Sequence, residues 1–378
     1  MNKVGTTVVA VLALLVAGAV GYAVGQSKEK SEPAVVQPVT TGTTGATAAT
    51  DAAPAPTTTT DTSGVTAGDR LEGLNLTAYT PGGYGTMDAR EDIQLLKNIG
   101  SNSVTIVPTW YVKNGSANEI EPNKTKTPTD QSLGKVIAWA KQAGLKVILK
   151  PHVDSMDGTF RGEIQPADRT RWFASYGNFI GHYAGLAANN GADTFVIGTE
   201  LKSLSSDTDP WKKVAQDVRS KFGGQLTYAA NWDEVDQVQF WDNLDLIGVD
   251  AYYPLASEGQ EPTEEDLASA WETPVSSLEA TSTKWGKPVM FTEIGYPSQT
   301  GAAAHPFEVR RGDPPDQKAQ AVAYRAAFMA FAGKPWFQGM QWWSWRADPG
   351  RNEKPPRAID YTPEGKKAET VLQENQTG

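Results

Sequence analysis

The chain has 378 residues, a formal net charge of −10 and no cysteine. This length allows one large domain or two of ordinary size, and without cysteine there are no disulfides and no lipid attached through an N-terminal cysteine. The acidic balance and the lack of basic clusters exclude nucleic acid and anionic lipid as partners of the folded part. Twelve tryptophans favour instead a neutral, ring-shaped ligand that stacks on aromatic side chains.

The N-terminal segment, residues 1–26, contains an apolar run over residues 4–24. This run is long enough to span a bilayer, so we expect a membrane anchor, and the alternative is a cleaved signal peptide. Residues 27–68 are rich in Thr, Ala and Pro and predict a disordered linker, because they cannot bury enough apolar surface to fold. We therefore expect residues 69–378 to form one extracytoplasmic domain, membrane-anchored or secreted, that meets the membrane only through the N-terminal segment.

Strand-like apolar runs alternate with amphipathic helical patterns through the whole expected domain. The eight expected strands are residues 71–79, 103–111, 146–154, 194–201, 225–232, 244–253, 288–296 and 337–346. The expected helices are residues 89–99, 130–143, 170–189, 209–222, 264–285, 316–332 and 363–373, with a weak one at 236–241. Such alternation predicts parallel strands with right-handed crossovers, and the simplest closed arrangement is a (β/α)8 TIM barrel. A doubly wound open sheet is the alternative, but the loop after the first strand lacks the spacing of a phosphate-binding loop.

Two glutamates, Glu200 and Glu293, end the fourth and seventh expected strands with the same Thr-Glu pair. A carboxylate at the tip of a buried strand is costly unless it is paired or reactive, and active sites of these barrels form at the carboxyl ends of the strands. Two facing carboxyls can cleave a glycosidic bond, one as the acid and one as the nucleophile or base. The alternative for either glutamate is an ion pair with a loop arginine.

Other polar and aromatic side chains collect at the same strand ends. His152 and Asp154 are two residues apart, so they share a strand face and could bind sugar hydroxyls or be structural. Strict alternation would likewise place Trp343 and Trp345 on one face of the last strand. The remaining candidates for substrate binding are Arg161, Asn231, Tyr252 and Tyr253. The three histidines show no ligand spacing, so we expect neither a metal nor another cofactor.

Four motifs together resemble glycoside hydrolase family 113, in the clan A barrels, over residues 69–376. They are Lys150-Pro-His-Val-Asp154 with Phe160-Arg-Gly162, Gly198-Thr-Glu-Leu201, Thr292-Glu-Ile-Gly-Tyr296 and Trp342-Trp-Ser-Trp345. The resemblance implies retaining hydrolysis of a neutral β-linked polysaccharide, with β-1,4-mannan as the first expectation. It implies Glu200 as acid/base and Glu293 as nucleophile.

The same resemblance assigns the neighbouring side chains. A tyrosine of the sixth strand, Tyr253 in preference to Tyr252, would hydrogen-bond Glu293. His152, Asp154 and Arg161 would surround the sugar next to the cleaved bond, with Trp343 or Trp345 as its platform.

Three positions depart from the pattern of the family or clan. Thr199 and Asp154 stand where Asn is common, and Phe160 stands where Trp is common. An exo-acting enzyme, a hydrolase of another β-glycan and a non-catalytic glycan-binding barrel therefore stay open as alternatives, and we expect a monomer.

Overall fold

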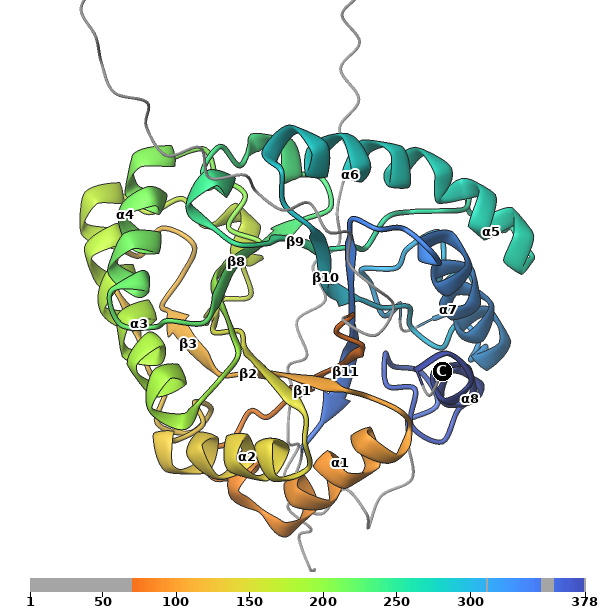
Figure 1. Ribbon diagram of the computed structural model, residues 1–378, viewed down its shortest axis with the longest axis horizontal. Coiled ribbons are helices and arrows are strands. Elements are labelled where there is room, and N and C mark those ends of the chain that lie inside the picture. The colour runs from red at the N-terminus through yellow and green to blue at the C-terminus, as the bar shows by residue number, and fades with distance from the viewer. Residues whose placement is uncertain (1–69, 311, 348–356, 377–378) are drawn as a thin grey trace, which may run out of the picture. The chain divides into compact units, whose positions relative to one another are not determined.

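The computed structural model describes residues 70–310, 312–347 and 357–376, which contain a closed barrel of eight parallel strands (Figure 1). Around the barrel the strands follow the order β1, β2, β5, β7, β8, β9, β10 and β11, and β11 closes onto β1. Their bounds are Gly73–Thr77, Ser103–Val107, Lys146–Leu149, Thr194–Thr199, Gln225–Asn231, Ile247–Asp250, Val289–Ile294 and Phe337–Arg346. The predicted (β/α)8 barrel is confirmed.

The predicted anchor or signal segment, residues 1–26, and the predicted linker, residues 27–68, lie outside the described residues. Within the described ranges, no helix has the length and apolar character needed to cross a membrane.

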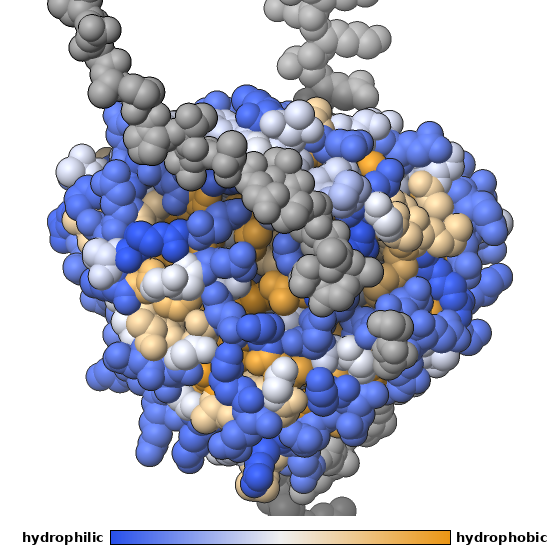
Figure 2. All heavy atoms as spheres, viewed as in Figure 1, coloured by the Kyte–Doolittle hydropathy of each residue, from blue (hydrophilic) through white to orange (hydrophobic). Residues whose placement is uncertain are grey.

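Helices surround the barrel (Figure 1). They are α1 (Met87–Asn98), α2 (Asp130–Gln142), α3 (Arg169–Asn190), α4 (Thr208–Arg219), α5 (Glu264–Ala270), α6 (Glu272–Trp285), α7 (Gln317–Phe331) and α8 (Lys367–Gln376), with 3-10 turns η2 (Gly83–Gly85), η3 (Arg161–Glu163), η4 (Val235–Gln237) and η5 (Trp241–Asn243). The expected helix 264–285 is broken in two, because Pro274 has no N–H to donate to the carbonyl of Ala270. Hydrophilic residues cover most of the outer surface in the view of Figure 2.

The core has two layers, one inside the barrel and one between the barrel and the helices. The inner layer consists of Ile148, Val196, Ala229, Leu246 and Met290, all buried. The outer layer is much larger and contains most of the buried aromatic rings. Tryptophan is therefore used widely as core, so its abundance alone does not identify a ligand site.

A small three-stranded sheet stands beside two of the expected strands. Pro108 and Pro151 have no N–H for the strand ladder, so the expected strands 103–111 and 146–154 are each divided. The second halves are β3 (Thr109–Val112) and β6 (His152–Ser155), which pair with each other in parallel, and β4 (Ile120–Glu121) pairs antiparallel to β3. This sheet carries His152 and Asp154 beyond the carboxyl end of β5.

A bulge in β11 breaks the alternation of its tryptophans. Leu74 of β1 pairs with Trp342 and Leu76 pairs with Trp345, so two residues of β11 stand opposite Asn75. Trp342 and Trp345 consequently both pack outward, Trp342 on Tyr324 of α7 and Trp345 against α1. The expectation that Trp343 and Trp345 share one face is wrong.

Candidate active site

Glu200 and Glu293 lie at the carboxyl ends of β7 and β10 and are both buried, with 7% and 3% of their surfaces exposed. The negative charge of Glu293 contributes to raising the pKa of Glu200, and Arg161 lies close enough to influence both carboxyls. The structure thus brings the two predicted carboxyls and the loop arginine to one end of the barrel.

Glu200 adopts an unusual backbone conformation. Its φ angle is 52°, in the left-handed region, which costs a residue other than glycine on the order of 1–3 kcal/mol. Its N–H donates to the carbonyl of Ala229 over 2.8 Å. Its Oε2 accepts from Nη1 of Arg161 over 3.1 Å, while Nη2 of Arg161 donates to Asp154 over 2.6 Å. Glu200 therefore forms the ion pair with a loop arginine that is the alternative explanation for such a glutamate, and Glu293 lies at the same end of the barrel.

The surroundings of Glu200 favour its protonated form. Burial, followed by the negative charge of Asp250, raises the pKa of the Glu200 carboxyl well above its ordinary value, although Arg161 opposes this rise. A protonated carboxyl is what a general acid requires at neutral pH.

The surroundings of Glu293 favour its ionised form. Nζ of Lys150 donates to Oε1 over 2.6 Å, and the hydroxyl of Tyr252 donates to Oε2 over 2.7 Å. Burial alone would raise the pKa of Glu293, but Lys150 and then His152 outweigh burial and hold that pKa below its ordinary value. Glu293 is therefore suited to act as a nucleophile.

Lys150 and Asp250 complete this buried cluster, and neither was among the predicted site residues. Nζ of Lys150 donates to both oxygens of Asp250 over 2.8 and 3.0 Å, and Thr292 donates to Oδ1 over 2.7 Å. Burial and the charge of Glu293 raise the pKa of Asp250 to about 6. The signal was present in the sequence, because Lys150 and Asp250 end apolar runs as the two glutamates do.

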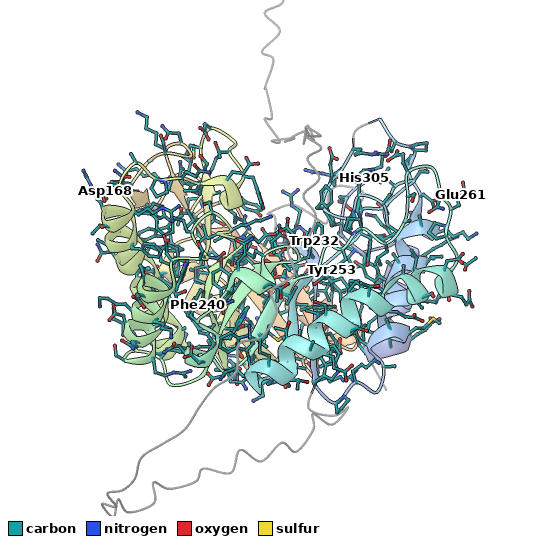
Figure 3. All side chains as sticks on the ribbon, turned by 90° about the horizontal axis from the view of Figure 1, so that it is seen from above. Asp168, Trp232, Phe240, Tyr253, Glu261 and His305 are labelled. Atoms are coloured by element: carbon teal, nitrogen blue, oxygen red, sulfur yellow. The ribbon has the colours of Figure 1, made fainter. Side chains whose placement is uncertain are left out.

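The tyrosine that bonds Glu293 is Tyr252, so the preference for Tyr253 is wrong. Tyr253 turns the other way, with its ring 5.6 Å from that of Trp232 and 5.5 Å from that of Trp271. Figure 3 shows Tyr253 and Trp232 close together near the middle of the domain. Asn231 lies at the end of β8, where its side-chain oxygen accepts from the N–H of Trp232 over 2.9 Å.

His152 and Trp343 form one wall of the site. Their rings stack with centroids 5.9 Å apart and planes 12° apart. Burial, followed by the charge of Arg161, lowers the pKa of His152 to about 4, so the ring is neutral at pH 7. Its Nε2 lies 3.5 Å from Oε1 of Glu293.

Trp345 lies outside this wall, which corrects its prediction as a sugar platform. Its side chain is 1% exposed, and Nε1 donates to Asp92 of α1 over 2.8 Å. The bulge in β11 is the reason, because it turns Trp345 away from Trp343.

The described residues contain no group of three or more His, Cys, Asp or Glu arranged to hold a metal ion. A cavity of about 360 Å³ lies between the segment before α5, residues 300–304 and α7, and none of the residues discussed above lines it. The two carboxyls of the site lie in contrasting surroundings, which favour the protonated form of Glu200 and the ionised form of Glu293.

Comparisons with known proteins agree with this arrangement. The family model described as Glycoside Hydrolase Family 113 matches residues 77–366, a range that contains Glu200 and Glu293. A comparison with curated protein sequences found no match.

Solved structures give a similar result. A complex of a β-1,4-mannanase of the same family is 27% identical, with a TM-score of 0.75 over 82% of this chain and 99% of the other. The β-mannanase of that family from Alicyclobacillus acidocaldarius, in complex with ManMIm, is 29% identical, with a TM-score of 0.73 over 82% and 97% of the two chains. A β-glucuronidase from Ruminococcus gnavus, 14% identical with a TM-score of 0.53 over 81% of this chain and 50% of the other, is similar in fold alone.

Proposed function

Because this chain belongs to glycoside hydrolase family 113 and is a glycoside hydrolase, we propose that it cleaves β-1,4-mannan with retention of anomeric configuration, Glu200 being the acid/base and Glu293 the nucleophile. The observation that carries the proposal is the contrast in surroundings of the two buried carboxyls, because Lys150 and Tyr252 donate to Glu293 while Glu200 is buried and accepts only from Arg161 among the described residues. The pKa of Glu200 is raised and that of Glu293 is lowered. When the surroundings of two neighbouring carboxyls shift their pKa values in opposite directions, one carboxyl is suited to act as the acid and the other as the nucleophile.

The first step forms a covalent intermediate. The ionised carboxylate of Glu293 attacks the anomeric carbon, and the bond from that carbon to the leaving oxygen breaks. Glu200 gives its proton to the leaving oxygen, which departs as a neutral hydroxyl. Glu200 is then ionised and Glu293 is esterified.

The second step releases the sugar. Glu200 takes a proton from a water molecule, whose oxygen attacks the anomeric carbon while the bond to Glu293 breaks. Both carboxyls return to their starting protonation states.

Lys150 and Tyr252 prepare Glu293 for this chemistry. Both donate hydrogen bonds to the carboxylate, one to each oxygen. These bonds fix its orientation and favour its charged form before the attack. Glu293 loses its negative charge when it forms the covalent bond, but the ammonium of Lys150 still donates to Asp250.

Mannan is proposed as the substrate because two solved structures of the family, 27% and 29% identical to this chain, are of β-mannanases. We propose that Trp343 stacks on the sugar next to the cleaved bond and that His152, Asp154 and Arg161 bind its hydroxyls. Asn231 and Tyr253 would bind the sugar on the leaving side.

We further propose that the domain acts as a monomer on a neutral polysaccharide outside the cytoplasmic membrane. The location is supported by the apolar N-terminal run and the Thr, Ala and Pro composition of residues 27–68.

The test compares the purified full chain with Glu200→Ala and Glu293→Ala on manno-, gluco- and xylo-oligosaccharides. We expect wild-type protein to release β-configured products from β-1,4-mannan, measured by NMR immediately after cleavage, and each variant to lose several orders of magnitude in rate. Azide should restore turnover of an activated aryl β-mannoside in Glu200→Ala and yield the β-azide, because azide attacks the intermediate without needing a base. Binding without release of reducing ends from any β-glycan would overturn the proposal.

A further inference from the structure

The residue after Glu200 is tied to a buried side chain that the proposed mechanism does not use. The N–H of Leu201 donates to the hydroxyl of Tyr228 over 3.0 Å. Tyr228 lies in the middle of β8 and is fully buried. This bond therefore restrains the chain immediately after the left-handed φ of Glu200.

The hydroxyl of Tyr228 is itself oriented by a second buried group. It donates to Oε1 of Glu234 over 2.8 Å, so it is donor and acceptor at once. Glu234 is fully buried, and its backbone N–H donates to the carbonyl of Asn231 over 2.9 Å. The second carboxyl oxygen of Glu234 has no hydrogen-bond partner among the described residues. Burial raises the pKa of Glu234 to about 8, so the group is neutral at pH 7 and this carboxyl carries no charge into the core.

The ring of Tyr228 is fixed by tight packing behind β7. Its centroid lies 5.1 Å from that of Trp211 and 5.4 Å from that of Phe240, both edge-to-face. A Cβ at Gly198 would lie 2.7 Å from Cε2 of Tyr228 and 2.8 Å from Cη2 of Trp211. Glycine two residues before Glu200 is thus what lets the two rings reach the strand.

We infer that Tyr228, oriented by Glu234, is a positioning residue that holds Glu200 in the left-handed backbone conformation from which its carboxyl protonates the leaving oxygen. A left-handed residue persists only where its surroundings over-determine it, and the hydrogen bonds of Glu200 to Ala229 and of Leu201 to Tyr228 flank this φ angle. Tyr228 does not contact substrate, because it packs on the outer side of the strand among Trp211 and Phe240. The inference rests on the proposed function, since it deepens the role given there to Glu200.

A loss of acid/base positioning has a kinetic signature that simple destabilisation lacks. A sugar leaving group needs a proton from Glu200, whereas a 2,4-dinitrophenolate leaves without one. The second chemical step needs Glu200 as base for either substrate. A misplaced Glu200 therefore lowers kcat/KM for an oligosaccharide, but for the dinitrophenyl glycoside it lowers kcat and leaves kcat/KM nearly unchanged.

The experiment measures both parameters for the full chain carrying Tyr228→Phe, with mannotetraose and 2,4-dinitrophenyl β-mannobioside as substrates. We expect kcat/KM for mannotetraose to fall by about 10- to 100-fold, within the range of general acid catalysis, and kcat/KM for the aryl substrate to change by less than about 3-fold. The matched control is Tyr324→Phe, which removes a buried hydroxyl that has no hydrogen-bond partner among the described residues. Tyr324→Phe should leave kcat and kcat/KM unchanged for both substrates.

Variants of Glu234 supply a second measurement that does not depend on Tyr228→Phe being folded. Glu234→Gln keeps an oxygen that accepts from Tyr228 and should behave like wild type, whereas Glu234→Leu removes the acceptor and should reproduce Tyr228→Phe. Equal losses on both substrates, or a Tyr228→Phe enzyme equal to wild type, would overturn the inference while leaving the proposed function intact. Wild-type protein that hydrolyses neither substrate would instead overturn the proposed function.

Discussion

Nζ of Lys150 lies 2.6 Å from Oε1 of Glu293, and both side chains are buried where β5 and β10 end. The same ammonium donates to Asp250, so one cation serves two carboxylates. A buried carboxylate without a cation is strongly disfavoured, and the pKa of Glu293 therefore depends on Lys150.

Replacing Lys150 by methionine should move the acidic limb of the pH profile to higher pH. Glu293 must be ionised to attack, and Lys150 lowers its pKa, so without Lys150 that pKa rises and activity is lost first at low pH. We expect kcat/KM at neutral pH to fall by about 100-fold or more. The pH dependence of kcat/KM on mannotetraose measures both effects.

The control for Lys150→Met is Lys146→Met, because Lys146 begins β5, the strand that Lys150 directly follows, but is exposed and pairs with Asp193. It should keep the wild-type profile. An acidic limb that does not move in Lys150→Met would contradict the role given to the ammonium.

Tyr252→Phe should lower kcat/KM much more than Tyr253→Phe. Of these two tyrosines, Tyr252 is the one that donates to Glu293, and a hydrogen bond to a charged group contributes about 1.5–3 kcal/mol. Tyr252→Phe should therefore lose about 10- to 100-fold in kcat/KM, whereas Tyr253→Phe, which keeps its ring on Trp232 and Trp271, should lose far less. Steady-state kinetics on mannotetraose measure kcat/KM for both variants. Equal losses would contradict a catalytic contribution of the hydrogen bond from Tyr252 to Glu293.

The barrel was predictable from the sequence because each strand is a short apolar run and these runs alternate with amphipathic helical patterns. The two glutamates were predictable because a charge at the end of such a run is conspicuous. Lys150 carries the same signal but stands before Pro151, inside the run of residues 146–154 that the apolar pattern predicts as one strand. A lysine at the tip of β5 is as conspicuous as a glutamate once the proline is recognised as the strand's end.

Two other details depended on tertiary structure. The bulge in β11 changes which face its tryptophans share, and a period-2 argument has no means of locating an extra residue. The choice between Tyr252 and Tyr253 likewise depends on how the chain turns after β9, where neither tyrosine lies within the strand. Adjacent residues with the same side chain give the sequence no basis for that choice.

Arg161→Gln should move the basic limb of the pH profile upward. Glu200 must be protonated for the first step, and Arg161 opposes the rise in its pKa, so removing the guanidinium raises that pKa further and the proton is retained to higher pH. We expect the maximum of kcat/KM to be lower, because Arg161 is also proposed to bind sugar. The basic limb of the kcat/KM profile should nevertheless lie at higher pH than in the wild type.

The matched control for Arg161→Gln is Arg169→Gln, which removes an exposed pair with Asp207 and should leave the profile unchanged. A basic limb that stays in place, or moves downward, in Arg161→Gln would contradict the contact between Arg161 and Glu200.

Trp343→Ala should weaken the reaction with substrate, whereas Trp345→Ala should lower the stability of the fold. Trp343 stacks on His152 at the site and is the proposed sugar platform, so Trp343→Ala should lower kcat/KM for mannotetraose with little change in Tm. Stacking on an aromatic ring is worth about 0.5–1.5 kcal/mol per pair, so we expect a loss of about 2- to 12-fold. Trp345 is core, so Trp345→Ala should cost about 3–5 kcal/mol of unfolding free energy and lower Tm by several degrees, while the protein that stays folded keeps the wild-type KM. Thermal unfolding and initial rates below the transition measure the two effects separately. A raised KM in Trp345→Ala with an unchanged Tm would return Trp345 to the sugar site and contradict the outward packing that the bulge in β11 imposes.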